Sequence, residues 1–297
     1  MHNVQRLLCS IESCYIKKLK VLLILPIEEK HMFGKKCIFC KKDSSTNKIT
    51  KEHVFPKWLK KELKETRGLV YTSQYIENRK PIDNSKFKKG LHPYDQVVKD
   101  VCMVCNNGWM SALESRIKDL LTKLIHGHDI VLNEEECNNF ALWSIKTALI
   151  LSHLEKGRST VPPQHYTTIM NGNIPDNVSV FIGYYRHDTD FTSRFLRGHI
   201  NFDSTSPDDS QTFYLSTFTI GHLYVHISYF SEIEIFKNLH SFDLGKHFKG
   251  SILRITPEFH GGRLEYPTKN PINYTKEDMS ALSIYMLTGE VSQPYGT

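Results

Sequence analysis

The sequence lacks any apolar run long enough to cross a membrane. A membrane-spanning helix needs about 20 consecutive apolar residues, whereas the apolar stretch at residues 21–25 ends at Pro26. Lysines precede this stretch, as in a signal peptide, but Glu28 and Glu29 follow it where a small-residue cleavage site would be expected. We therefore expect no membrane association. Residues 1–31 are interpreted as an N-terminal extension of unclear role, with Met32 as an alternative natural start.

Cysteines are few, and their number is odd. A small secreted protein held by disulfides usually has an even count in a dense framework, whereas this chain has 7 cysteines in 297 residues. Three of them are scattered, and four form two Cys-x-x-Cys pairs: Cys37 with Cys40, and Cys102 with Cys105. The pattern indicates a reducing, cytoplasmic setting and one thiolate metal site.

Acidic residues are scarce around these pairs. Residues 35–123 hold 20 basic and 10 acidic side chains, while residues 124–297 hold 13 basic and 19 acidic ones. A local surplus of positive charge suits a polyanion such as nucleic acid. A solvated basic face without a partner would give the same composition, so charge alone leaves both interpretations open.

The two cysteine pairs bracket the dipeptide Glu52-His53, and Asn106 follows the last cysteine directly. Four thiolates in two paired knuckles are the ligand set of a tetrahedral structural Zn²⁺. A zinc ion that joined the knuckles would bring Glu52, His53 and Asn106 together, although they are far apart in the chain. Asn107 is an adjacent alternative to Asn106, and Asn106 could also serve as a helix N-cap.

Hydrophobic periodicity predicts the elements around this motif. Strands are expected at 49–55 and 96–101, a short helix at 57–65, and an amphipathic helix from about 106 to 127. Residues 66–94 are polar, with glycine and proline breakers, and predict an insertion. Its lysines Lys86, Lys88 and Lys89 flank an aromatic residue and are candidates for contact with a phosphate backbone. A solvated loop is the alternative.

The second half of the chain changes character. Asn133 followed by three glutamates predicts an N-capped helix that stops near Gly157, and a short helix is expected up to Met170. Aromatic and β-branched residues then predict strands at 178–185, 195–202, 212–220, 222–230 and 252–255, and a helix is expected at 275–287. The predicted fold class is α+β with a mostly antiparallel sheet. The predicted domains are 32–130 and 131–297.

The segments Glu52-His-Val-Phe-Pro56 and Cys105-Asn-Asn-Gly108 resemble the HNH endonucleases, which are ββα-metal nucleases. The resemblance covers roughly residues 35–125. It implies a zinc-stapled ββα-metal module with His53 as general base. It also implies Glu52 and Asn106 as ligands of a catalytic Mg²⁺ or Mn²⁺. The structural zinc would be held by Cys37, Cys40, Cys102 and Cys105. The chain as a whole is similar to uncharacterised bacterial proteins that pair this module with a C-terminal domain, for which the resemblance implies no function.

Two positions depart from the family pattern. Glu52 replaces the commoner aspartate, so its longer side chain changes the distance to a metal. The middle asparagine that usually supports the histidine loop is missing, since Val97 or Val98 lies near its place. Gln96 is the nearest amide and a candidate substitute. The loss bears on the orientation of His53 more than on the metal site.

Three functions are consistent with the sequence. The first is a metal-dependent endonuclease that hydrolyses phosphodiester bonds, expected to act on DNA. The second is a catalytically inactive zinc module that binds nucleic acid without cutting it, which the missing asparagine favours. The third is an interaction protein whose C-terminal domain binds a protein partner. The intact Glu-His and Cys-Asn elements favour the first.

Overall fold

A computed structural model describes residues 19–22, 35–63, 75–77, 80–82, 92–154, 161–186, 193–202, 211–231, 251–256 and 263–267. These residues form helices and antiparallel sheets, as expected for an α+β chain. The predicted helix at 275–287 and the lysines Lys86, Lys88 and Lys89 lie outside the described residues. No helix in the described ranges combines the length and apolarity that a membrane span requires.

The largest sheet has six strands in the order β1-β8-β9-β10-β7-β11, and neighbouring strands are antiparallel. Their bounds are β1 Leu19–Leu22, β7 Val178–Tyr184, β8 Ser193–Phe202, β9 Gln211–Ile220, β10 Leu223–Phe230 and β11 Ile252–Thr256. Every residue of β10 is buried, so both faces of this strand are covered. This explains why the sequence alternates only partly in these strands, since alternation arises where one face meets water.

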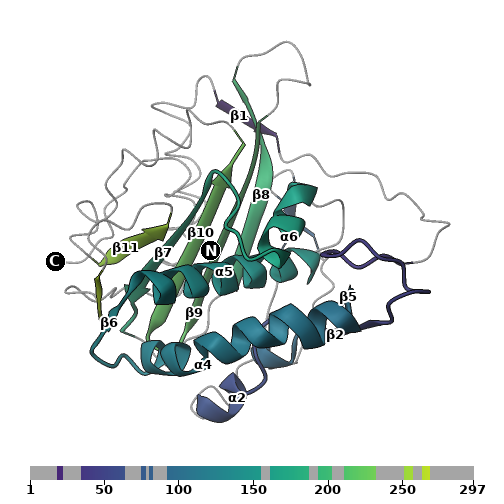
Figure 1. Cartoon of the computed structure of the whole chain (residues 1–297). Coiled ribbons are helices and arrows are strands. Elements are labelled where there is room, and N and C mark those ends of the chain that lie inside the picture. Colours follow the sequence, from purple (N-terminus) through teal and green to yellow (C-terminus); the bar gives the residue numbers. More distant parts are fainter. Residues whose placement is uncertain are drawn as a thin grey trace.

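Helix α5 (Glu134–Leu151) crosses one face of this sheet and is the centre of the fold (Figure 1). Asn133 caps it through a capping box with Glu136, which satisfies backbone N–H groups at the helix start. From Phe140 to Leu151 its residues are buried on all sides, because it packs against β7, β10 and β11 and also against helices α4 (Ser111–Ile125) and α6 (Pro163–Met170). The single-turn helix η4 (Ser152–Leu154) continues it.

Helix α4 is fixed to the sheet at its C-terminal end. The N–H of His222, in the turn between β9 and β10, donates to the carbonyl of Ile125 at 2.9 Å. Gly221 has φ +54°, and a Cβ at this position would collide with the same carbonyl, so only glycine permits the approach. The Tyr266 hydroxyl donates to the carbonyl of Leu124 at 2.9 Å. These contacts hold α4 in place.

A separate two-stranded sheet carries the motif residues. Strand β2 (Ile49–His53) pairs antiparallel with β5 (Val97–Cys102), and helix α2 (Leu59–Glu62) follows β2. After β5, the short helix α3 (Met103–Cys105) and the π-helical turn η3 (Asn106–Met110) lead directly into α4. The order strand, insertion, strand, helix follows the prediction, although α2 is shorter than the expected helix at 57–65.

Some elements were not predicted. The insertion contains the 3-10 turn η2 (Pro93–Asp95) and a hairpin of β3 (Tyr75–Glu77) and β4 (Lys80–Ile82). Strand β6 (Ile130–Leu132) pairs with β12 (Leu264–Tyr266), which joins segments far apart in the sequence. One hydrophobic core runs through both predicted domains, since buried residues from Cys37 to Tyr266 form one cluster. Where the chain divides into domains stays a prediction.

Candidate metal centre and active site

The four paired cysteines converge. Their Sγ atoms all lie within 4.8 Å of one another, and the Sγ atoms of Cys40 and Cys102 are 3.7 Å apart. A tetrahedral Zn²⁺ with Zn–S bonds of about 2.3 Å requires S–S separations of about 3.8 Å. Cys37, Cys102 and Cys105 are buried, and Cys40 is partly exposed. The cluster therefore fits a tetrahedral ion with soft ligands.

The backbone conformation and hydrogen bonds of the two knuckles favour a metal-binding arrangement of the four thiols. In the first knuckle the N–H of Lys41 donates to the carbonyl of Cys37 at 3.0 Å. Lys41 itself has φ +60°, which turns the chain back sharply. In the second knuckle the N–H of Cys105 donates to the Sγ of Cys102 at 3.5 Å. The N–H of Cys102 donates across to the Sγ of Cys37 at 3.3 Å. N–H groups aimed at sulfur favour the thiolate form that binds metal.

The thiols influence one another's ionisation. A hydrogen bond from the Cys105 thiol, opposed by burial and assisted by backbone N–H groups, lowers the pKa of Cys37 to about 4. The neighbouring Cys37 sulfur and burial raise the pKa of Cys105 far above its ordinary value. One thiolate thus forms easily and further ones are opposed by like charge. Four thiolates require a cation among them, which agrees with a metal-binding role.

Glu52 is a buried acid on β2. Its side chain is 7% exposed, and within the described residues it forms no hydrogen bond or ion pair. Burial raises the pKa of Glu52 to about 7, with Glu114 adding to the effect and Lys146 opposing it. A carboxylate held here without a hydrogen-bond donor is suited to a cation as its partner.

His53 is half-buried at the end of β2, next to Glu52. Burial, together with the charge of Lys57, lowers the pKa of His53, while Asp95 and Glu114 act in the opposite direction. The imidazole is therefore neutral at physiological pH. A neutral imidazole can accept a proton, as a general base must.

Asn106 connects the helical segment to β2. Its Nδ2 donates to Thr50 Oγ1 at 3.2 Å and to the carbonyl of Lys51 at 3.3 Å. Both acceptors lie just before Glu52 on the same strand. The structure thus brings Asn106 beside the strand that carries Glu52 and His53. The side-chain carbonyl of Asn106 takes no part in these two hydrogen bonds. Asn107 is exposed.

The register of β2 and β5 locates the missing asparagine. Val98 lies opposite Glu52 and Val97 opposite His53, with an irregularity between Thr50 and Glu52. Two apolar residues therefore face the dipeptide across the strand pair. Gln96 is buried at 3% exposure, and its backbone carbonyl accepts from the N–H of Val54 at 3.1 Å. Gln96, the amide residue nearest to the place of the missing asparagine, is therefore in the core, beside the segment that follows His53.

Two charged residues near the motif were not predicted. Lys146, on α5, is fully buried, and its Nζ lies 2.7 Å from Glu114 Oε1 on α4. Both influence the pKa of Glu52. The sequence signal was a lysine within the mostly apolar second half of the helix, between Trp143 and Leu149. A buried lysine requires an acidic partner, but the spacing of residues in the sequence does not indicate which acidic residue this is.

The first knuckle is anchored to the helices. Phe39 packs edge-on against Trp109 and Tyr166, with ring centroids 5.0 and 5.6 Å away. Asp100 on β5 pairs with Lys35 at 2.8 Å and with His153 at 3.5 Å. Burial would raise the pKa of Asp100, but these two partners lower it well below its ordinary value. The cysteine cluster is therefore joined to the helices that cover the large sheet.

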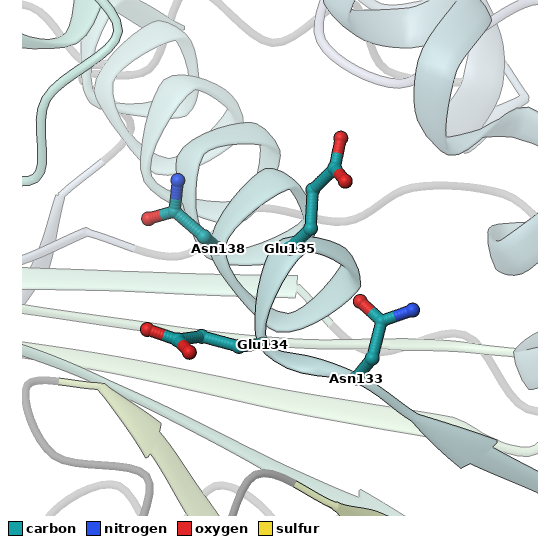
Figure 2. Close-up of a pocket in the computed structure, with 4 residues that line it drawn as sticks. All are labelled: Asn133, Glu134, Glu135 and Asn138. Atoms are coloured by element: carbon teal, nitrogen blue, oxygen red, sulfur yellow. The ribbon is translucent and has the colours of Figure 1, made fainter.

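A shallow depression elsewhere has no part in this site. Figure 2 shows Asn133, Glu134, Glu135 and Asn138 around the first turn of α5. The N-terminus of α5 is remote from β5, because η4 at the opposite end of the helix contacts β5 and 18 residues of helix span about 27 Å.

Among the other histidines near the motif, His126 pairs with Glu62 at 3.0 Å and stacks on His128.

The chain has no match among protein-family models, curated proteins or solved structures. The site is thus characterised by its own residues: four convergent thiols, a buried carboxylate, a half-buried histidine and an asparagine hydrogen-bonded to the strand that carries both.

Proposed function

We propose that this protein is a metal-dependent endonuclease of the HNH type that hydrolyses phosphodiester bonds of DNA. The observation that carries the proposal is the proximity of Asn106 to the Glu52-His53 strand, next to the four-cysteine cluster. The cluster would hold a structural Zn²⁺. Glu52 and the Asn106 carbonyl would hold Mg²⁺ or Mn²⁺, since both offer the hard oxygen ligands that these ions prefer.

The chemistry assigned to each residue follows from its surroundings. His53, neutral and half-buried, accepts a proton from the attacking water as its oxygen forms a bond to phosphorus and the bond from phosphorus to the leaving oxygen breaks. A divalent ion bound at Glu52 and Asn106 would offset the negative charge that develops on the phosphate and the leaving oxygen. Lysines around the motif attract the phosphate backbone.

Plasmid cleavage with added Mg²⁺ or Mn²⁺, with His53→Ala alongside, tests the proposal. We expect nicking or linearisation by the wild type, and a rate lower by about 10²-fold or more in the variant, as for loss of a general base. An RNA substrate in parallel shows which nucleic acid is cut. Equal cleavage by both proteins, with the metal content of the cysteine cluster intact, would remove the nuclease assignment from this site.

A second candidate is a zinc module that binds nucleic acid without cutting it. The observation that favours it is the register of β2 and β5, which puts Val97 and Val98 opposite the Glu52-His53 dipeptide, where the family's asparagine is expected. Salt-dependent DNA binding without cleavage under any divalent ion would support this candidate over the first.

A further inference from the structure

The two cysteine knuckles have the same spacing, but their middle residues differ in environment. In the first knuckle Phe39 is fully buried, and Ile38 packs against the core. In the second knuckle Met103 is 46% exposed and Val104 is 59% exposed. These are two of the three large apolar side chains that stand exposed in the described part of the chain. Solvent exposure of two adjacent apolar residues on a rigid turn indicates a contact surface.

Two exposed lysines lie near this pair. The N–H of Met103 donates to the carbonyl of Lys48 at 2.8 Å, so Lys48 lies directly beside the knuckle. Lys51 lies on β2, which begins one residue after Lys48, and its carbonyl accepts from Asn106 Nδ2 at 3.3 Å. Both lysines are exposed, and neither forms an ion pair within the described residues. We call the group Lys48, Lys51, Met103, Val104 and Asn107 the knuckle surface.

The knuckle surface adjoins the proposed active site. Lys51 immediately precedes Glu52, and Asn107 follows Asn106. A ligand that covers Met103 and Val104 would therefore extend toward His53. Space for it exists at the helix start, where a Cβ on Gly108 would meet no atom within 4 Å.

The composition favours DNA over a protein partner. Stable protein interfaces bury about 1,200–2,000 Å² and are depleted in lysine at their centres. Here two exposed apolar side chains lie near two lysines that form no ion pair with the described residues. Proteins that bend DNA have the same composition: cations that contact phosphates, beside apolar side chains such as methionine that wedge between base steps.

We propose that the knuckle surface binds duplex DNA, with Met103 and Val104 pressed against a base step and Lys48 and Lys51 on the flanking phosphates. This inference rests on the proposed function, and it adds how the substrate is seated. Unstacking beside the site would present a distorted backbone to His53, which implies a preference for deformable steps.

Fluorescence anisotropy with a short duplex, without Mg²⁺ or Mn²⁺ so that no cleavage occurs, tests the inference. Met103→Ser with Val104→Ser should weaken binding about tenfold or more without altering the salt dependence, because apolar contacts release no counterions. Lys48→Gln with Lys51→Gln should lower the slope of log affinity against log salt by about 2. Val131→Ser is the matched control, because Val131 is 48% exposed on β6.

A duplex with 2-aminopurine supplies a second readout, since this base brightens when it is unstacked. We expect brightening with the wild type and with Val131→Ser, but not with the double-serine variant. Equal affinity and equal brightening for the double-serine variant would overturn the inference while leaving the nuclease proposal intact. A wild type that neither binds nor cuts DNA would overturn both. Equal metal content and circular dichroism spectra confirm that the variants are folded.

Discussion

At the residue scale, the three side chains of the proposed active site have different tasks, so their variants should fail differently. His53→Ala should retain DNA binding and divalent-ion binding but lose cleavage. Glu52→Ala and Asn106→Ala should lose affinity for the divalent ion, so raising Mg²⁺ or Mn²⁺ should restore part of their activity. Cleavage rates measured across a metal titration distinguish the two patterns. Recovery of His53→Ala at high metal would contradict the assigned roles.

The Lys146–Glu114 pair gives a second prediction at this scale. Removing one member of a buried ion pair leaves an uncompensated charge and costs about 3–5 kcal/mol, whereas replacing both members is often close to neutral. Lys146 is fully buried but the Glu114 side chain is 26% exposed, so Lys146→Met should destabilise the protein by less than this, because water partly solvates the carboxylate that is left. Urea unfolding gives the free energies.

The double variant Lys146→Met with Glu114→Gln is the control for this prediction. It should regain a large part of the stability that Lys146→Met loses, because no unpaired carboxylate remains at position 114. If the double variant is as unstable as the single one, the loss arises from packing around Lys146 and not from the charge pair.

At the scale of elements, the cysteine cluster joins two turns that are far apart in the sequence. Cys102→Ser should release the metal and disorder the β2–β5 pair, because structural zinc in small modules supplies on the order of 10 kcal/mol of apparent binding free energy. Cys137→Ser is the control, since Cys137 is buried in α5 outside the cluster. Metal analysis should give about one zinc per chain for the wild type and the control, and none for Cys102→Ser.

The lysines of the insertion can be tested in the same way. Changing Lys86, Lys88 and Lys89 to glutamine should flatten the salt dependence of DNA binding if the insertion lies along the backbone. An unchanged slope would assign these lysines to a solvated loop.

At the scale of the whole molecule, two buried histidines predict how stability depends on pH. Burial lowers the pKa of His165 to about 4 and that of His226 to about 3. In the unfolded chain both should titrate near 6.5. As pH falls from about 6.5 to 4, the unfolded chain takes up protons that the folded chain refuses, so stability decreases. Each pKa unit corresponds to about 1.4 kcal/mol at most.

Thermal unfolding between pH 4 and 7 checks this expectation. His165→Gln should flatten the curve, whereas the exposed His128→Gln should not. The neutral His165 ring contacts the Tyr214 hydroxyl at 3.1 Å, so the variant should be compared by the slope of its stability with pH and not by its absolute value. Parallel curves for His165→Gln and the wild type would contradict the prediction.

The sequence by itself determined the features that depend on short spacing. Two Cys-x-x-Cys pairs indicated a four-thiol centre, because each pair can turn both sulfurs to one point. Asn133 and the three glutamates after it predicted the start of α5, and the strands predicted at 212–220 and 222–230 agree with β9 and β10. The strands and helices that carry Glu52, His53 and Asn106 were predicted to within a few residues. These features follow from local geometry and need no distant partner.

Only the tertiary structure decided which distant segments meet. Cys40 and Cys102 are 62 positions apart, and Glu114 and Lys146 are 32 apart. The partner of a buried lysine depends on how α4 packs on α5, which periodicity does not specify. The exposure of Val104 and the burial of Phe39, at equivalent positions of the two Cys-x-x-Cys motifs, likewise depend on which knuckle faces α6. The spacing of residues in the sequence determines which helix, strand or turn a segment can form, whereas tertiary packing determines which other segments it contacts.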